Sequence, residues 1–324
     1  MPANCKSVIA GQNGPARSLS HDRRHRTMTD IRSGDWAERY APAGLVPYIR
    51  LARLDRPIGT WLLLFPGWWA IALAAPHWPD WRLMALFGIG ALTMRGAGCT
   101  LNDIIDRDFD AQVARTRVRP LPSGAVSVRQ ALVFMSLQLA VGAAVLACLD
   151  PLAIGLGCLV LLLIGTYPLM KRITYWPQFF LGLNFNWGAL MGWAAATGRL
   201  DAPAFLLYAG GIAWTLGYDT IYAHQDKEDD VLVGVKSSAL ALGRRTRPWL
   251  CVFYAAALAG WAAAGAVAGM AWLFWVGLGL AGLQLAWQAA LVDIDDPGDC
   301  LEKFRSNRWI GWLMLLACIA GHVV

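Results

Sequence analysis

Nine apolar stretches, each long enough or nearly long enough to cross a lipid bilayer, dominate the sequence. In chain order they cover residues 58–75, 81–101, 131–149, 152–169, 179–195, 205–222, 249–268, 272–292 and 309–323. A helix of about 18–20 residues, rising about 1.5 Å per residue, spans a hydrocarbon core of about 30 Å. The pattern therefore predicts an all-α, polytopic membrane protein with about nine transmembrane helices in one bundle.

The composition agrees with this class of protein. Of the 324 residues, 57% are hydrophobic and 15% are charged, whereas a soluble domain is about half apolar and about a quarter charged. The 17 Trp residues suit a bilayer, because amphipathic rings favour its two interfaces. These proportions exclude a disordered or fibrous protein and disfavour a water-soluble enzyme.

Basic residues gather in alternate joins between the stretches. The odd-numbered joins carry only Arg82 and Arg199. The positive-inside rule places the even-numbered joins and the N-terminus in the cytoplasm, so nine spans put Val324 on the far side. Topology thus explains much of the net charge of +6, which gives no support to a nucleic-acid partner. The even-numbered joins carry Arg107, Arg115, Arg117, Arg119, Arg129, Lys171, Arg172, Lys227, Lys236, Arg244, Arg245, Arg247, Lys303, Arg305 and Arg308.

Residues 1–45 differ from the rest of the chain. They are polar, rich in Arg, His and Ser, and contain no apolar core for a secretory signal. We expect a disordered cytoplasmic tail over 1–45, or an extension upstream of a start at Met28, followed by one transmembrane domain over 46–324. Four acidic residues count against a mitochondrial transit peptide: Asp22, Asp30, Asp35 and Glu38.

The cysteines are scattered and form no CxxC pair. Several lie within apolar runs, so we expect buried thiols rather than disulfides or metal ligands. The seven are Cys5, Cys99, Cys148, Cys158, Cys251, Cys300 and Cys318.

Carboxylates gather at two of the cytoplasmic joins. After the second stretch, Asp103, Asp106 and Asp110 are spaced i, i+3 and i+7, which places them on one face of a helix that continues from that stretch. Asn102 begins the same turn. After the sixth stretch a second acidic stripe recurs at i, i+7 and i+11, with Tyr222 inside it: Asp219, Asp226 and Asp230.

Stacked carboxylates repel one another unless a cation lies nearby. Mg²⁺ is typically held by a few carboxylates together with substrate phosphates. Two acidic stripes at the cytoplasmic ends of two helices therefore predict that bridging metal ions hold a diphosphate, neutralise its charge and help it to leave. The alternative for each stripe is an ordinary acidic loop paired with nearby arginines, and finding two stripes weakens that alternative.

Cations flank both stripes. Arg119 precedes a Pro-Leu-Pro-Ser-Gly turn, Lys236 follows the second stripe, and Arg53 and Arg56 precede the first apolar stretch. Each of them has two interpretations, as a contact to a phosphate group or as a cation that only fixes the topology.

At these residues the chain resembles the UbiA superfamily of intramembrane prenyltransferases, from about Leu51 to the C-terminus. Two further segments, Leu54-Asp55-Arg56-Pro57-Ile58-Gly59 and Tyr167-Pro168-Leu169-Met170-Lys171-Arg172-Ile173-Thr174, followed by Trp176-Pro177-Gln178, are similar to its hydroxybenzoate branch. Asn184 and Asn186, inside the fifth stretch, match no family feature, and we interpret them as interhelical hydrogen-bonding groups. The superfamily motifs are Asn102-Asp103-x-x-Asp106-x-x-x-Asp110, Arg119-Pro120-Leu121-Pro122-Ser123-Gly124, and Tyr218-Asp219-Thr220-Ile221-Tyr222 leading to Asp226-x-x-x-Asp230.

The resemblance implies a nine-helix bundle around a central cavity that opens sideways to membrane lipid. It implies Mg²⁺-dependent transfer of a polyprenyl group from polyprenyl diphosphate to C3 of 4-hydroxybenzoate, a step of ubiquinone biosynthesis. An allylic carbocation would form as the diphosphate leaves and would then be attacked by the aromatic ring. A membrane bundle supplies the water-poor surroundings that such a cation needs.

The resemblance also implies roles for individual residues. Arg172 is the first choice to bind the carboxylate of the aromatic acid, since an arginine can donate two parallel hydrogen bonds to a carboxylate, and Lys171 is the second. The alternative is that this pair only anchors the fourth span. Asp103, Asp106 and Asp226, with Arg172, are the expected catalytic residues. The expected metal ligands are Asn102, Asp103, Asp106, Asp110, Asp226 and Asp230, and the expected substrate contacts are Asn102, Arg53, Arg56, Arg119, Lys171, Asp219, Tyr222 and Lys236.

Two alternatives remain at this point. One is a UbiA-type transferase with another acceptor, namely naphthoate, homogentisate or haem. The other is a cation-coupled transporter, which the clustering of the acids at one membrane face disfavours, because transport acids usually lie near the middle of the bilayer. We expect a bacterial inner membrane, with the mitochondrial inner membrane as the alternative compartment.

Overall fold

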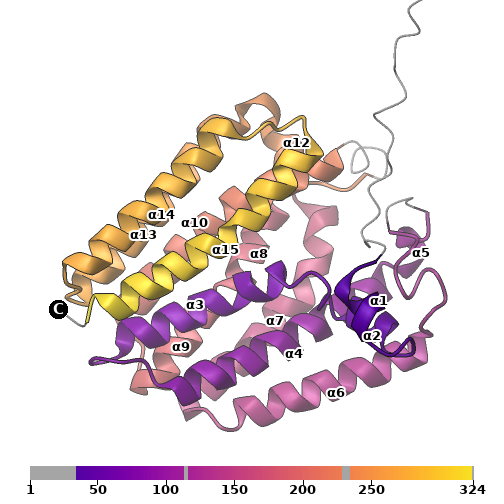
Figure 1. The fold of residues 1–324 in the computed structure, drawn as a ribbon, viewed down its shortest axis with the longest axis horizontal. Helices are drawn as coiled ribbons and strands as arrows, with labels where there is room; N and C mark the ends of the chain where they lie inside the picture. Colours follow the sequence, from indigo (N-terminus) through magenta and orange to yellow (C-terminus); the bar gives the residue numbers. More distant parts are fainter. Residues whose placement is uncertain (1–33, 113–115, 228–233, 323–324) are drawn as a thin grey trace, which may run out of the picture.

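The computed structural model describes residues 34–112, 116–227 and 234–322, and within them it is a bundle of helices with no strand (Figure 1). Six short elements lie at or near the ends of the long helices: α1 (Trp36–Tyr40), α2 (Val46–Leu51), α5 (Arg107–Asp110), η1 (His224–Asp226), α12 (Ser238–Leu242) and η2 (Gly243–Arg245). The ten longer helices are α3 (Ile58–Ala74), α4 (Trp81–Ile105), α6 (Val128–Leu146), α7 (Pro151–Ile173), α8 (Pro177–Phe185), α9 (Trp187–Thr197), α10 (Ala202–Ala223), α13 (Thr246–Val267), α14 (Trp272–Leu291) and α15 (Pro297–Ala320).

Every predicted apolar stretch coincides with one of these longer helices, except that the fifth is divided between α8 and α9. Five segments are both long and apolar enough to cross a membrane by themselves, namely α4, α6, α7, α14 and the continuous run of α12 to α13, and α3 is a shorter apolar helix. The prediction of a helical, multi-pass membrane protein is confirmed. The count of nine spans and the central cavity stay predictions.

The break between α8 and α9 falls at Asn186. Asn186 Nδ2 donates to the carbonyl of Gly182 at 2.9 Å and to Thr215 Oγ1 on α10 at 2.8 Å. Gly211 makes room for this side chain, since a Cβ at that position would lie 2.1 Å from Asn186 Oδ1. The interpretation of Asn186 as an interhelical hydrogen-bonding residue is therefore confirmed.

Glycines allow the central helices to approach closely. A Cβ on Gly260 of α13 would lie 2.9 Å from the Cα of Gly210 on α10, and a Cβ on Gly192 of α9 would lie 2.5 Å from the carbonyl oxygen of Gly67 on α3. In a bilayer, helices associate through such small-residue contacts because apolar side chains gain little by leaving lipid. These contacts hold α10 against α13 and α3 against α9.

Three tryptophans fill the centre of the bundle. The rings of Trp69, Trp214 and Trp261 lie 5.2 to 5.8 Å apart between centroids. Two of the indole N–H groups are satisfied across the core, because Trp69 donates to the carbonyl of Gly311 and Trp214 donates to Asn307 Oδ1. The aromatic centre thus joins α3, α10 and α13 to α15.

A smaller apolar cluster lies at the end of the bundle where α4 meets α5. It combines Leu51 of α2, Leu121 and Val126 of the loop after α5, and Ala131 of α6, all of them buried. This cluster fixes the position of the chain immediately after α2 and of the loop that begins near Thr116.

Two further expectations concern the tail and the cysteines. Within the predicted tail, residues 36–40 form α1, while residues 1–33 lie outside the described part of the chain. The six described cysteines are all free. Those at 99, 300 and 318 are buried, but those at 148, 158 and 251 are exposed, so the prediction of buried thiols was wrong for half of them, which face outward from their helices.

Candidate active site

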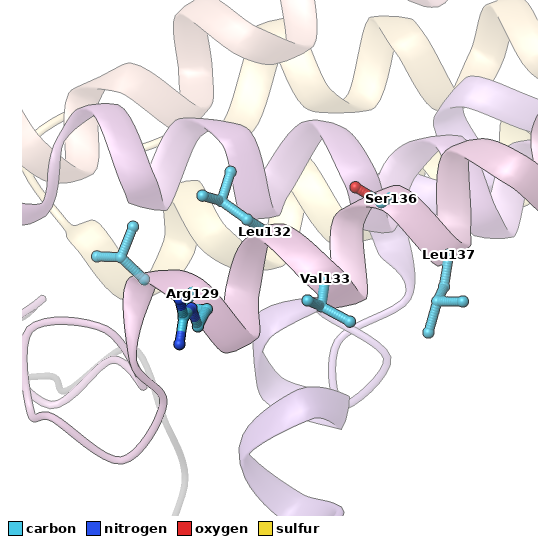
Figure 2. Close-up of a pocket in the computed structure, with 6 residues that line it drawn as sticks. Arg129, Leu132, Val133, Ser136 and Leu137 are labelled. Atoms are coloured by element: carbon cyan, nitrogen blue, oxygen red, sulfur yellow. The ribbon is translucent and has the colours of Figure 1, made fainter.

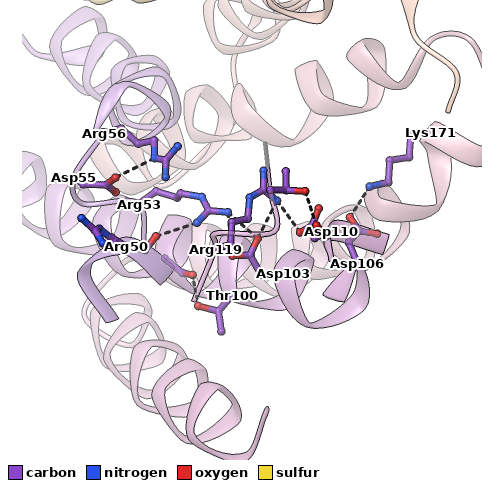
Figure 3. Close-up of polar contacts among 12 residues, drawn as sticks. Arg50, Arg53, Asp55, Arg56, Thr100, Asp103, Asp106, Asp110, Arg119 and Lys171 are labelled. Atoms are coloured by element: carbon purple, nitrogen blue, oxygen red, sulfur yellow. Dashed lines mark hydrogen bonds and ion pairs between the residues drawn. The ribbon is translucent and has the colours of Figure 1, made fainter. Parts of the chain in front are cut away.

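Three buried carboxylates lie where α4 ends. Asp103, Asp106 and Asp110 are 0%, 3% and 5% exposed. α4 ends at Ile105 and Asp106 caps it, yet the chain keeps a helical path, because the Asp110 N–H donates to the Asp106 carbonyl at 2.8 Å. The three side chains consequently gather on one side of the chain, as the i, i+3, i+7 spacing predicts (Figure 3).

Arg53 neutralises the first of these carboxylates. Its Nη2 atom lies 2.7 Å from Asp103 Oδ1 and 2.9 Å from Asp103 Oδ2. Its backbone φ of 58° is the only positive value found at a described non-glycine residue. Such a conformation is energetically unfavourable for an L-residue and persists only where the surroundings impose it, which here are the Asp103 ion pair and a hydrogen bond from Arg53 Nη1 to the Arg50 carbonyl.

Three more cations complete the set. Arg119 Nη1 donates to Asp110 Oδ2 at 2.8 Å and lies 3.5 Å from Asp103 Oδ1. Lys171, at the end of α7, donates to Asp106 Oδ2, and Arg172 lies 3.6 Å from Asp106 Oδ1. Each carboxylate of the cluster is therefore already paired with a basic side chain from another segment of the protein.

Electrostatics explains why so many cations are needed. Burial raises the pKa of Asp110 above its ordinary value, Arg119 opposes this shift, and the neighbouring Asp103 and Asp106 reinforce it. Buried charges are tolerated only when they are paired or bound to a metal ion. The three carboxylates therefore place several negative charges close together, and positive groups must balance these charges.

The donor chemistry of this cluster fits Mg²⁺, which prefers oxygen ligands. Carboxylates at three positions and the amide of Asn102 supply such oxygens. Across the described ranges, however, no three acidic, His or Cys side chains converge as a ready metal site, and the carboxylates are paired with cations instead. Binding a metal ion here requires those cations to move.

The second predicted stripe is only partly described. Asp219 lies on α10, Asp226 lies in η1 with its side chain outside the described part, and Asp230 lies wholly outside it. Tyr222 packs against the ring of Phe304 at 4.4 Å between centroids. His224 Nε2 is 2.9 Å from Thr246 Oγ1, and burial, together with Lys227, lowers its pKa to about 4, so this histidine is a neutral structural neighbour of the stripe.

Arg95, inside α4, is a residue that the sequence interpretation missed. Its Nε atom is buried without a hydrogen-bond partner in the described structure, and its guanidinium lies 5.3 Å from the Phe185 ring centroid. Asp219 and Tyr167 lie within electrostatic range of it. The signal was present in the sequence, because Arg95 lies two helical turns before Asn102 on the same face and charged residues inside a span are usually functional.

Two predicted substrate contacts lie outside the carboxylate cluster. Arg56 Nε bonds to Asp55 Oδ2 at 3.1 Å. Lys236 Nζ donates to the carbonyl of Ile173 at 3.1 Å and lies 5.4 Å from the Tyr175 ring centroid. The structure thus brings together Arg53, Arg119, Lys171 and Arg172 around the carboxylates and places Arg56 and Lys236 beside other partners.

One surface pocket has no connection with this chemistry. It lies along the exposed side of α6, and its lining is mostly apolar (Figure 2). Leu137 in this lining is 62% exposed, as expected for a helix face that meets lipid. The pocket is lined by Val128, Arg129, Leu132, Val133, Ser136 and Leu137.

Comparison with known proteins identifies close relatives. The human (Homo sapiens) mitochondrial 4-hydroxybenzoate polyprenyltransferase is 51% identical over 286 residues, which cover 87% of this chain and 77% of that protein. The mitochondrial protein of the same name from Arabidopsis thaliana is 48% identical over 296 residues, which cover 90% of this chain and 72% of that protein.

Solved structures share the fold. A UbiA homologue from Aeropyrum pernix K1 is 26% identical with a TM-score of 0.69, and the match covers 80% of this chain and 97% of that one. A UbiA homologue from Archaeoglobus fulgidus, bound to GPP and Mg²⁺, is 18% identical with a TM-score of 0.62 and matches over 86% of this chain and 100% of that one. The sequence model of the UbiA prenyltransferase family matches residues 63–319. The chain therefore belongs to the UbiA prenyltransferase family.

Proposed function

We propose that this protein transfers a polyprenyl group from polyprenyl diphosphate to C3 of 4-hydroxybenzoate. The observation that carries the proposal is the cluster of three buried, cation-paired carboxylates at the end of α4. The likeness to proteins named 4-hydroxybenzoate polyprenyltransferase, at about half of all aligned positions, supports the choice of donor and acceptor. Residues 46–324 would form the transferase domain, and residues 1–45 would form an N-terminal tail.

The diphosphate is the group that this cluster would receive. We propose Asn102, Asp103, Asp106 and Asp110, with Asp226 and Asp230 from the second stripe, as ligands for Mg²⁺. The Archaeoglobus fulgidus homologue, bound to GPP and Mg²⁺, supports the choice of metal. When bound, Mg²⁺ would offset the negative charge that grows on the diphosphate as its bond to the prenyl carbon breaks.

The observed ion pairs define what the basic residues would do. Arg53, Arg119 and Lys171 now neutralise the carboxylates. With diphosphate and its metal ions bound, the carboxylates would have a stronger cationic partner, and these basic groups would be available to donate hydrogen bonds to phosphate oxygens. Arg172 and Lys236, at the same end of the bundle, would screen the diphosphate from farther away.

The acceptor needs a cation for its carboxylate and room for its ring. Arg172 was the first expectation for this role, but its side chain is 59% exposed and faces Asp106. We propose Arg95 instead, since its buried Nε atom lacks a hydrogen-bond partner in the described structure and an aromatic ring covers its guanidinium. Asp219 and Tyr222, on the helix opposite Arg95, would contact the same acceptor.

The reaction balances without any further reactant. The bond between the prenyl carbon and the diphosphate oxygen breaks, and pyrophosphate leaves with the electron pair. C3 of the ring donates an electron pair to the resulting allylic cation, and the proton at C3 would then pass to the released pyrophosphate, which restores aromaticity. The apolar bundle excludes water, which would otherwise capture the cation as a prenyl alcohol.

We propose the mitochondrial inner membrane as the membrane that holds this protein. The relatives above are named as mitochondrial proteins. They do not bear out the expectation of a bacterial inner membrane. The alternative, the mitochondrial inner membrane, fits their names. Membrane fractionation of the native host would test it, and recovery in a bacterial inner-membrane fraction would contradict it.

A direct assay tests the activity. Membranes containing the full-length protein are supplied with Mg²⁺, 4-hydroxybenzoate and polyprenyl diphosphates of several chain lengths, and prenylated acid is measured by chromatography. The proposal predicts product that depends on all three components. Folded protein that yields no product with any donor would contradict the proposal. Product only with naphthoate, homogentisate or haem would show that the acceptor is not 4-hydroxybenzoate.

A further inference from the structure

A groove of about 810 Å³ opens on the surface of the bundle between α14 and α15, and it shares no residue with the carboxylate cluster. Both helices begin or end on the side of the bundle that the positive-inside rule predicts to be cytoplasmic, and the groove occupies the half of each helix nearest that side. Its lining combines aromatic, basic and acidic side chains: Gln284, Trp287, Gly298, Leu301, Glu302, Arg305, Ser306, Arg308 and Trp309.

The walls of this groove are fixed by internal contacts. Lys303 is only 5% exposed, donates to Asp299 Oδ1 at 2.8 Å, and holds its ammonium 4.2 Å from the Trp287 ring centroid. Gln284 Nε2 donates to the carbonyl of Ser306 at 2.9 Å, which ties α14 to α15 along the groove. A buried cation and an interhelical hydrogen bond thus hold Trp287 in place as one wall.

Charges follow a definite order along α15. Glu302, Arg305 and Arg308 are spaced three residues apart and all three line the groove. Each is separated from the next by about 4.5 Å along the helix axis. α15 begins at Pro297 on the cytoplasmic side, and Glu302 is therefore the outermost of the three. Trp309, which is 54% exposed, follows toward the membrane interior, with the Arg308 guanidinium 4.9 Å from its ring centroid.

This order matches the parts of a zwitterionic phospholipid with a primary ammonium. We propose that the groove binds phosphatidylethanolamine, with the ammonium at Glu302, the phosphodiester at Arg305 and Arg308, and the glycerol and first acyl carbons against Trp287 and Trp309. Basic pockets between transmembrane helices bind lipid headgroups at this depth, and aromatic residues favour the interface. A carboxylate at the outer end disfavours an anionic headgroup, and choline has no N–H to donate to it.

Titration of the purified full-length protein with single lipids tests the site. Native mass spectrometry would count the palmitoyl-oleoyl phosphatidylethanolamine or phosphatidylglycerol retained by each molecule. We expect the wild type to retain one phosphatidylethanolamine about tenfold more tightly than phosphatidylglycerol, and Arg305→Ala with Arg308→Ala to weaken that binding at least about tenfold, since losing one charge-assisted hydrogen bond is worth about that much.

Two further variants make the test specific. Arg129→Ala removes an arginine from the exposed side of α6, outside this groove, and should leave phosphatidylethanolamine binding unchanged. Glu302→Gln keeps the size of the side chain but removes its charge, and it should abolish the preference over phosphatidylglycerol. Equal retention of the two lipids by the wild type would overturn the proposal. If the double arginine variant does not fold, an unaltered lipid preference in Glu302→Gln overturns it equally.

Discussion

Asp106 and Asp108 are two positions apart and lie in opposite surroundings. Asp106 is 3% exposed and bonded to Lys171 of α7, whereas the side chain of Asp108 is 86% exposed and, among the described residues, pairs with its neighbour Arg107. The acidic motif includes Asp106 and does not include Asp108. The residue in the motif is thus the buried one, and the residue outside the motif is the exposed one. The two residues form a matched pair for testing the diphosphate site.

We predict that Asp106→Ala lowers turnover at least about 100-fold, because the proposed Mg²⁺ site would lose a ligand and the charge on the leaving group would be offset less well. Asp108→Ala should retain nearly normal turnover. Prenylation of 4-hydroxybenzoate in membranes at saturating Mg²⁺, normalised to the amount of inserted protein, measures both. Near-normal turnover of Asp106→Ala would remove this residue from the metal site.

Arg95 and Arg172 allow the acceptor contact to be located. We predict that Arg95→Gln raises the KM for 4-hydroxybenzoate about 10- to 100-fold, the range expected for one or two charge-assisted hydrogen bonds, with a smaller effect on the KM for the diphosphate. Arg172→Gln, at an exposed position, should change the KM for the acid less. Steady-state kinetics with each substrate varied in turn measures the effect of each variant on the KM values. If Arg172→Gln raises the KM for the acid more than Arg95→Gln does, the contact to the carboxylate belongs to Arg172.

At the scale of the helix, the contact of α10 with α13 depends on glycine. The Cβ of alanine at position 260 would meet the Cα and N atoms of Gly210 at 2.9 Å and the carbonyl oxygen of Leu206 at 3.0 Å. Backbone atoms cannot rotate away as a flexible side chain can, so the two helices would have to separate. In the described part of the chain, no atom outside the helix's own backbone lies within 4 Å of a Cβ built at Gly155 on α7.

We predict that Gly260→Ala lowers the free energy of unfolding by about 1–3 kcal/mol through overpacking. Gly155→Ala should leave stability unchanged or raise it by up to about 1 kcal/mol, because alanine favours helix. Reversible unfolding in mixed detergent micelles, followed by circular dichroism, measures both changes. If Gly260→Ala unfolds with the same free energy as the wild type, the close contact of α10 with α13 does not contribute to stability.

The helices themselves were predictable, and their irregularities were not. Hydropathy located the stretches because lipid requires apolar side chains over a whole span. The division of α8 from α9 at Asn186 has no proline or glycine at the break itself to announce it, and it depends on Thr215 of α10, 29 residues away. The start of α15 at Pro297, twelve residues before the predicted stretch at 309, was missed because its first turns are polar.

At the scale of the whole molecule, the carboxylate cluster couples segments that are remote in sequence. Its cations come from the link between α2 and α3, from the loop after α5 and from the end of α7. The spacing of the acids was predictable from helical periodicity, but their partners were not, since pairs formed across 50 and 65 residues depend on the tertiary fold. Hydropathy does not single out Arg95, because one charge leaves α4 apolar enough to count as a candidate membrane span.

This coupling predicts how metal and diphosphate bind. At the proposed site, Mg²⁺ alone would have to displace the basic groups from the carboxylates, whereas pyrophosphate bound with Mg²⁺ would give those groups a new partner. The two ligands should therefore each strengthen the binding of the other. We expect Mg²⁺ to bind at least about tenfold more tightly when pyrophosphate is present. Isothermal titration calorimetry of the purified protein measures the difference.

Lys171→Met provides the internal comparison for that measurement. Removing the ammonium leaves Asp106 with the longer contact to Arg172, at 3.6 Å, and so weakens its pairing. Mg²⁺ alone should therefore bind this variant more tightly than it binds the wild type, and the advantage conferred by pyrophosphate should shrink. If Mg²⁺ binds the wild type equally well with and without pyrophosphate, the basic groups do not move from the carboxylates to the pyrophosphate.

The pairing of Asp103 and Asp106 also sets an order of events during synthesis of the chain. Arg53 precedes Asp103 by 50 residues, so that carboxylate has its partner as soon as it leaves the ribosome, while Lys171 follows Asp106 by 65 residues. At about 5–20 residues per second, Asp106 waits about 3–13 s for its ammonium. During that interval Lys171 is not yet available to it. A position at the end of α4 is therefore favourable, because the nascent helix can leave this residue outside the bilayer until α7 has been made.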